Sequence, residues 1–105
     1  MQAKIWNVNG WIKETDPQVL ATFFDAAIAD ARFGVLETVE HHFTPQGYTK
    51  LYLLCESHFA LHTFPEAGKT YFELSSCNEA KYNAFLRIID GKLERAGLWH
   101  DLVST

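Results

Sequence analysis

The chain has 105 residues, 48% of them hydrophobic, and its nine Lys and Arg against thirteen Asp and Glu give a formal net charge of −4. This length predicts a single domain, residues 1–105, that buries about two-thirds of its unfolded surface, so a partner subunit would add stability. The acidic balance argues against nucleic acid or an anionic membrane surface as a partner. The sequence shows neither a membrane-spanning run nor a signal peptide, and we expect a cytoplasmic protein.

The first third of the chain predicts a strand followed by a helix. Ile, Trp, Val and Thr mix with Asn and Gly in residues 5–15, which indicates a strand that is bulged or broken near Gly10. Asp16 and Pro17 are typical of a helix N-cap followed by proline at the first helical position. Apolar residues then recur at helical spacing, and Gly34 is expected to end the helix.

The remaining two-thirds predict four strands, a second helix and a last short strand. Turn residues separate the first pair of strands, and a connection with Pro and Gly separates the second pair. The expected elements are strands at 35–43, 48–56, 58–63 and 70–77, a helix at 82–93 and a strand at 98–103. This order predicts an α+β fold, a mainly antiparallel sheet with two helices on one face.

One face of this sheet is left without a covering layer. We expect apolar side chains such as Tyr52, Leu54 and Tyr71 on it. A symmetric homodimer that packs sheet on sheet would cover them and complete an αβ sandwich.

Two of the predicted strands place reactive side chains near one another. Alternate residues of a strand share a face, so Cys77 lies on the same face as Glu73. If the strands at 58–63 and 70–77 are neighbours, His62 and Cys77 can converge beside Ser57, which directly precedes the first of them.

Ser57 is placed for a reaction in which the chain cuts itself. Its hydroxyl can attack the carbonyl of Glu56 and convert the amide to an ester by an N-to-O acyl shift. A base that removes the Ser57 α-proton then expels the Glu56 carboxylate by β-elimination, and hydrolysis of the dehydroalanine leaves a pyruvoyl group. Proximity and one positioned acid or base are enough for such slow, single-turnover chemistry.

The same segment resembles a known family. The run ESHFALHTF at 56–64, the Pro-Glu pair at 65–66, the TPQG turn at 44–47 and Cys77, twenty residues beyond the serine, are together similar to the prokaryotic S-adenosylmethionine decarboxylases. The match extends over about residues 35–78.

This resemblance implies an enzyme, a carboxy-lyase, with an internal cofactor. Cleavage between Glu56 and Ser57 would convert Ser57 to the pyruvoyl cofactor, with His62 as the processing base and Cys77 as the proton donor in turnover. The pyruvoyl group would condense with the amine of a small amino-acid-type substrate and accept the electrons released with carbon dioxide. The product of S-adenosylmethionine would supply aminopropyl groups for polyamine synthesis.

The sequence departs from the family pattern at positions that would bind the side chain of the substrate. S-adenosylmethionine needs an aromatic slot, a cation-binding face and an acid for the ribose, which Phe43, Phe64 and Glu66 could supply. Homologues with the same machinery decarboxylate arginine or ornithine, which an acidic pocket at Glu66 and Glu73 would suit. A non-processing homologue with a binding or structural role is the third alternative.

The cysteines and histidines do not predict a metal site. Cys55 lies in an apolar run and is expected in the core, whereas Cys77 is expected at an exposed turn, both as free thiols. They form no C-x-x-C pair, and adjacent His41 and His42 point to opposite faces of a strand. We therefore expect no metal, and the G-x-S-x-G elbow of a serine hydrolase is also absent.

Overall fold

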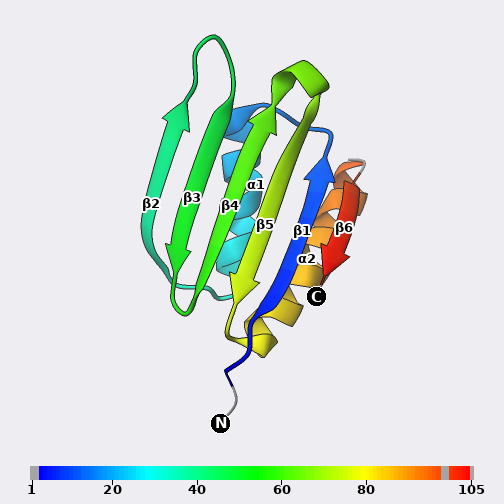
Figure 1. Ribbon diagram of the computed structural model, residues 1–105. Helices are drawn as coiled ribbons and strands as arrows, with labels where there is room; N and C mark the ends of the chain where they lie inside the picture. The colour runs from blue at the N-terminus through cyan, green and yellow to red at the C-terminus, as the bar shows by residue number, and fades with distance from the viewer. Residues whose placement is uncertain (1–2, 98–99, 105) are drawn as a thin grey trace.

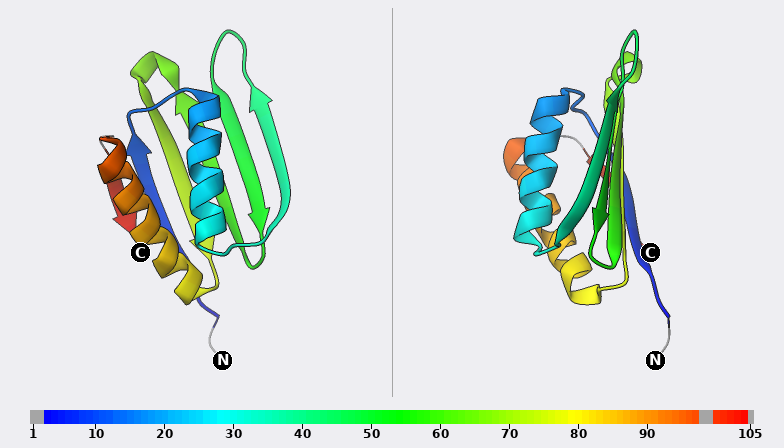
Figure 2. Two further views of the ribbon diagram at one scale, coloured as in Figure 1. Left: turned by 180° about the vertical axis from the view of Figure 1, so that it is seen from behind. Right: turned by 90° about the vertical axis from the view of Figure 1, so that its left-hand side faces the viewer.

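The computed structural model describes residues 3–97 and 100–104, which form a six-stranded sheet with two helices on one face (Figures 1 and 2). All neighbouring strands are antiparallel, in the order β2-β3-β4-β5-β1-β6, which confirms the predicted α+β fold. The strands are β1 (Trp6–Ile12), β2 (Val35–His42), β3 (Tyr48–Leu54), β4 (Ser57–Phe64), β5 (Lys69–Ser76) and β6 (His100–Ser104). The helices are α1 (Pro17–Asp30), α2 (Glu79–Ala96) and the 3-10 turn η1 (Pro65–Ala67).

Two predicted details of the first third are wrong. β1 pairs with β5 in unbroken register through Gly10, so the strand has no bulge there. Helix α1 begins as predicted, with the Asp16 side chain accepting backbone N–H groups of its first turn, but it ends at Asp30. The cause is Arg32, whose φ of 68° takes the chain into the left-handed region two residues before the expected glycine.

The end of the chain follows the prediction over the residues described. β6 begins at His100 and pairs with β1, whereas Leu98, where we expected this strand to begin, lies outside the described residues. Within residues 3–97 and 100–104, neither helix is long and apolar enough to cross a membrane.

Strands β3 and β4 are joined by a two-residue turn that the sequence did not predict. Leu54 pairs with Ser57, so only Cys55 and Glu56 form the turn, and Glu56 takes a φ of 60°. Ser57 is therefore the first residue of β4 and not part of a break between strands. Cys55 is exposed because it occupies this turn, and the expectation that it lies in the core is wrong.

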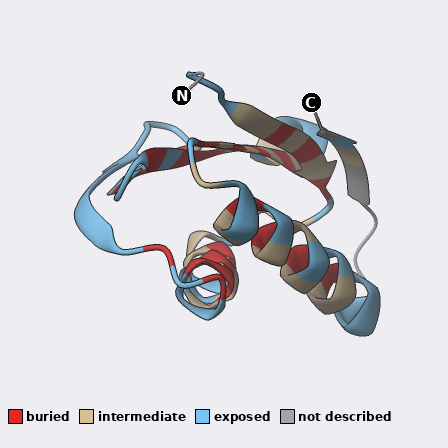
Figure 3. Ribbon diagram, turned by 90° about the horizontal axis from the view of Figure 1, so that it is seen from below, coloured by how far each residue is buried: buried red, intermediate tan, exposed pale blue. Residues whose placement is uncertain are grey.

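The core lies between the sheet and the two helices (Figure 3). The ring of Phe24 in α1 lies 4.9 Å from that of Phe59 and 5.1 Å from that of Phe72, and all three side chains are buried. Strand alternation sends every second side chain of β4 and β5 into this layer. The remaining side chains of each strand therefore lie on the face of the sheet that the helices do not cover.

The other face of the sheet has no covering layer within the described chain, as expected, but two of the side chains predicted there are misplaced. Tyr52 and Leu54 point to the helix side, where they are 3% and 1% exposed, while Tyr71 lies on the open face. The large apolar side chains that β2, β3 and β4 expose on the open face are Val39, Leu51, Leu53 and Phe64.

A polar cluster ties α1 to β3 on the helix side. The Tyr52 hydroxyl donates to Oδ1 of Asp25 at 2.5 Å, and Nζ of Lys50 lies 3.6 Å from the same oxygen and 4.7 Å above the Tyr52 ring. Burial and then the hydrogen bond to the Asp25 carboxylate raise the pKa of Tyr52 above its usual value. The hydroxyl therefore stays protonated in the folded chain at pH values where an unfolded tyrosine ionises.

We expect Tyr52→Phe to lower the free energy of unfolding by about 1–2 kcal/mol at neutral pH, because the Asp25 carboxylate loses its donor. An unfolded tyrosine ionises near pH 10, so the raised pKa of Tyr52 makes the folded state lose stability as the pH rises above about 10. The variant lacks this contribution, so its stability should fall less steeply there. Urea unfolding at several pH values measures both the loss of stability and its pH dependence, in the Ser57→Ala background, which keeps the chain in one piece. If the free energy of unfolding falls equally steeply above about pH 10 in both proteins, the predicted role of the Tyr52 pKa is wrong.

Candidate active site

The expected cleavage site lies at one end of the sheet, where β4 begins and β5 ends. Ser57 pairs with Ser76 in the ladder, and the backbone N–H of Cys77 donates to the carbonyl oxygen of Glu56 at 3.0 Å. Cys77 is exposed, as predicted, because it directly follows the last residue of β5. The structure thus brings Glu56, Ser57 and Cys77 together.

The Ser57 hydroxyl points to the helix side of the sheet and is nearly buried. It donates to Oγ of Ser76 at 2.7 Å, and Ser76 has no exposed surface. Oγ of Ser76 also accepts the backbone N–H of Asn78 at 2.9 Å, and Asn78 is the N-cap of α2. Ser76 was not among the residues predicted for the site, although the register of β4 and β5 places it directly opposite Ser57.

His62 lies far from Ser57, so the expected convergence of these residues within one chain is wrong. His62 pairs with Tyr71, five residues along β4 from Ser57, a distance of about 17 Å along the strand. The odd spacing also places the two side chains on opposite faces of the sheet. The antiparallel register that joins Ser57 to the end of β5 is what carries His62 toward the start of β5.

The His62 ring is held by its two neighbouring strands. Nδ1 of His62 lies 2.9 Å from Oγ1 of Thr49 on β3, and the ring stacks on Tyr71 of β5 with 6.4 Å between centroids. Thr49 is another residue that was not predicted for the site. The two-residue turn between β3 and β4 would have identified it, because that turn sets Thr49 opposite His62.

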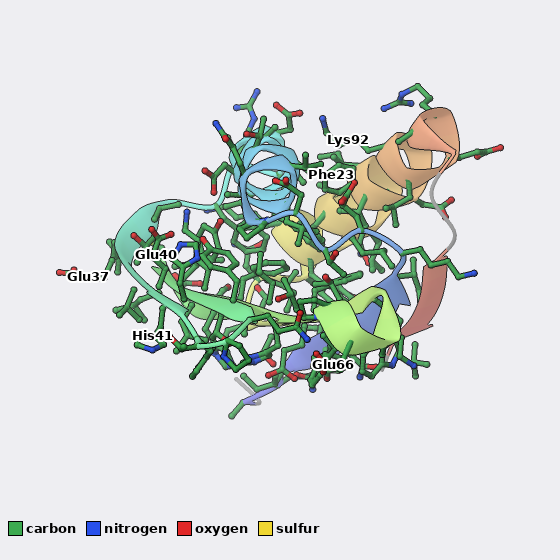
Figure 4. The ribbon with its side chains drawn as sticks, turned by 90° about the horizontal axis from the view of Figure 1, so that it is seen from above. Phe23, Glu37, Glu40, His41, Glu66 and Lys92 are labelled. Atoms are coloured by element: carbon green, nitrogen blue, oxygen red, sulfur yellow. The ribbon has the colours of Figure 1, made fainter. Side chains whose placement is uncertain are left out.

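Three of the four residues expected to bind substrate lie at the His62 end of the sheet. Phe43 follows β2, Phe64 ends β4 with its ring 5.7 Å from that of Trp11, and Glu66 belongs to η1. Nε2 of Gln46 donates to Glu66 at 3.4 Å, which links η1 to the loop between β2 and β3. Figure 4, which looks down on this end, shows Glu66 on the side of the sheet away from the two helices.

The fourth residue, Glu73, lies in the middle of the open face. It is opposite Ala60 of β4, and its carboxylate accepts the Tyr71 hydroxyl at 3.0 Å. Burial and then this carboxylate raise the pKa of Tyr71. Beside Glu73 the open face is hollowed by about 450 Å³, with a lining that includes Leu51, Leu53, His58, Ala60 and His62. Among residues 3–97 and 100–104, no three His, Cys, Asp or Glu side chains come together as metal ligands would.

Comparisons with known proteins agree with this architecture. The structure resembles the crystal structure of the adenosylmethionine decarboxylase from Aquifex aeolicus, with a TM-score of 0.72 over 98% of this chain and 91% of that one. The sequence identity is 17%, so this similarity concerns the fold. A six-stranded sheet with two helices on one face is therefore an architecture that a decarboxylase structure shares.

Sequence comparison places the chain in a family. The family description of S-adenosylmethionine decarboxylase matches residues 5–98. S-adenosylmethionine decarboxylase proenzymes are 35% identical over 65% of this chain in Prochlorococcus marinus and 31% identical over 73% in Bacillus anthracis. The chain spans about half the length of these curated relatives, 56% and 58%. The chain belongs to the S-adenosylmethionine decarboxylase family.

Proposed function

We propose that this chain is a cytoplasmic, self-processing decarboxylase of S-adenosylmethionine whose pyruvoyl cofactor is made from Ser57. The observation that supports this most directly is the contact of the Cys77 N–H with the Glu56 carbonyl, next to the Ser57 hydroxyl, in a chain of this family. The relatives are named proenzymes, which fits a chain that must be cut before it acts. The product would donate aminopropyl groups in polyamine synthesis.

The geometry around Glu56 suits the first step of self-cleavage. When the Ser57 hydroxyl attacks the Glu56 carbonyl carbon, negative charge develops on the carbonyl oxygen. The Cys77 N–H already donates to that oxygen at 3.0 Å, so the charge develops against a donor that needs no rearrangement. The Glu56 φ of 60° holds this carbonyl at the tip of a tight turn, where the end of β5 can reach it.

The residues at this end also fit a pyruvoyl group at position 57. Such a group would supply an electron sink for decarboxylation. The Cys77 thiol, exposed and one residue beyond the partner of Ser57 in the ladder, would protonate the substrate carbon that loses carbon dioxide. A protonated thiol next to the reacting carbon can act as a general acid.

The distance between the two ends of β4 favours a homodimer. One chain cannot bring His62, Phe64 and Glu66 to Ser57, because β4 separates them by about 17 Å or more. Two sheets packed face to face about a two-fold axis, with their strands reversed, would set the His62 end of one copy over the Ser57 end of the other. The exposed Leu51 and Leu53 on the open face supply apolar area for this contact.

The substrate-binding residues favour S-adenosylmethionine over a basic amino acid. Phe43 and Phe64 are 50% and 39% exposed, so their rings are available to an adenine or a sulfonium. Glu66 accepts a hydrogen bond from Nε2 of Gln46 at 3.4 Å, a longer contact than the 3.0 Å bond from Tyr71 to Glu73, and its carboxylate could also accept a ribose hydroxyl. Glu73, the acid that would have to bind a guanidinium or ammonium, already accepts the hydroxyl of Tyr71.

Self-cleavage is the first expected outcome. The chain should separate into residues 1–56 and 57–105, with the second fragment blocked by a pyruvoyl group, and Ser57→Ala should abolish the cut because no hydroxyl remains to attack. Intact mass after incubation decides this. A wild-type chain that stays whole would place the protein in a binding or structural role instead.

Mixed variants test the homodimer. His62→Ala alone should be cut about 100-fold more slowly than wild type, because a positioned base contributes a factor of this order. Co-expression with Ser57→Ala chains should restore cutting of the His62→Ala chains, since each mixed dimer has one site with both residues. Intact mass distinguishes the two chains. A partner carrying both substitutions is the matched control, and equal cutting with either partner would show that His62 does not act across the dimer.

The processed protein should release carbon dioxide from S-adenosylmethionine and not from arginine or ornithine. Cys77→Ser should slow turnover by about tenfold or more and speed inactivation, because slower protonation of the substrate carbon lets the proton reach the cofactor carbon instead. Release of labelled carbon dioxide and loss of activity per turnover measure these effects. Normal turnover with no faster inactivation would remove Cys77 from the mechanism.

A further inference from the structure

The buried hydroxyl of Ser76 has no place in the chemistry described so far. It lies at 2.7 Å from Oγ of Ser57, the atom that changes its bonding twice during self-cleavage. In the uncut chain the two buried hydroxyls satisfy each other's hydrogen bonding. Ser75, the neighbour of Ser76, points to the other face, where it donates to Oδ1 of Asn7. We propose that Ser76 is a positioning residue for the second step of self-cleavage. In that step it donates a hydrogen bond to Oγ of Ser57, which leaves as one oxygen of the new C-terminal, main-chain carboxylate of Glu56.

The protons on the two hydroxyl groups show how this contact can change during the reaction. In the uncut chain the Ser57 hydroxyl donates to Ser76, whose own proton is directed to the backbone carbonyl of Asn78 at 3.3 Å. Oγ of Ser76 also accepts the Asn78 N–H at 2.9 Å. Ser76 is therefore held by a good acceptor bond and a long, weak donor bond, which leaves its proton available to another acceptor.

The acyl shift reverses the polarity of the contact between the two serines. The bond from the Glu56 carbonyl carbon to the Ser57 nitrogen breaks, the bond to Oγ of Ser57 forms, and the hydroxyl proton ends on the freed amine. The ester oxygen carries no proton, so the 2.7 Å contact can persist as a hydrogen bond only when Ser76 donates. A rotation of the Ser76 hydroxyl is enough, because its bond to Asn78 is the weaker alternative.

The β-elimination places charge where Ser76 points. A base takes the α-proton of Ser57, the electron pair of that bond forms the Cα–Cβ double bond, and the Cβ–Oγ bond breaks with its pair remaining on Oγ. This oxygen becomes one oxygen of the Glu56 carboxylate, and the other accepts the Cys77 N–H at 3.0 Å. Both oxygens of the leaving carboxylate thus have donors already in place, and hydrogen bonds to a charged group are the stronger kind.

The arrangement of faces agrees with this assignment. The Ser57 side chain and Ser76 lie on the helix side of the sheet, so Oγ leaves toward a buried donor. The face of the sheet opposite the Ser57 side chain is open, so a base supplied from that face would not have to displace the buried donor.

The test rests on the proposed self-cleavage and uses chain freshly made by cell-free synthesis. Wild type and the variants Ser76→Ala, Ser76→Thr and Ser75→Ala are followed by intact mass, with and without hydroxylamine, which cuts an ester between residues 56 and 57 but leaves an amide whole. In Ser76→Ala a hydroxylamine-sensitive chain should accumulate, and the pyruvoyl fragment should form about 10- to 100-fold more slowly. Ser76→Thr, which keeps the hydroxyl, should restore the rate, and Ser75→Ala should match wild type.

The outcomes separate this proposal from the function on which it rests. A wild-type chain that never cuts overturns the proposed function itself. If wild type cuts and Ser76→Ala cuts equally fast without an ester, or stays whole and resists hydroxylamine, the assignment of Ser76 to the second step is wrong. Thermal unfolding checks that the variants fold. If Ser76→Ala does not fold, Ser76→Cys, a weaker donor of similar size, replaces it, and the hydroxylamine-sensitive ester should accumulate in that variant as well.

Discussion

The arrangement of this site depends on the two-residue turn between β3 and β4. By closing the hairpin at Cys55 and Glu56, the turn sets the register of β3 against β4, and β4 then pairs with β5 along its whole length. A slip of one residue would send every side chain of β4 to the other face. The turn therefore places the peptide between Glu56 and Ser57 at the end of the ladder and decides that the Ser57 hydroxyl faces the helices.

The same register is stabilised by the core and not by the reactive residues. Phe59 and Leu61 follow Ser57 on the helix side and are buried against α1 and its neighbours. Their burial fixes the face to which Ser57 points, because strand alternation ties all three together. The strain of a left-handed Glu56, on the order of 1–2 kcal/mol, is small beside the burial of several such side chains. The unfavourable backbone conformation of Glu56 is thus held by packing several residues away.

Much of the fold could be predicted from the sequence because its elements carry strong local signals. Asp16 and Pro17 marked the start of α1, and the turn residues at 44–47 marked the first hairpin. The second hairpin carried no such signal, since a φ of 60° at its turn is normally taken by Gly or Asn and here falls on Glu56. Because that turn could not be predicted, the residues opposite each position of β4 could not be assigned from the sequence.

The predicted site shows the consequence of not predicting that turn. The reactive residues Ser57 and Cys77 were identified correctly as neighbours, because their motif lies close to the strand ends. His62 was misplaced, and Ser76 and Thr49 were missed, because all three depend on register. A sequence motif can predict a type of chemistry, whereas only the pairing of strands shows which side chains of one chain can meet.

Under the proposed function, this separation links the chemistry to assembly. The ladder that brings the Cys77 N–H to the Glu56 carbonyl places His62 toward the far end of β4. One chain would therefore hold the carbonyl and its hydrogen-bond donor at one end of the sheet and the proposed base at the other. A second copy would supply that base from the open face, which is also the face whose apolar side chains require a cover. Cleavage before dimerisation would then be disfavoured, and each cofactor would form only where a substrate pocket had already been built around it.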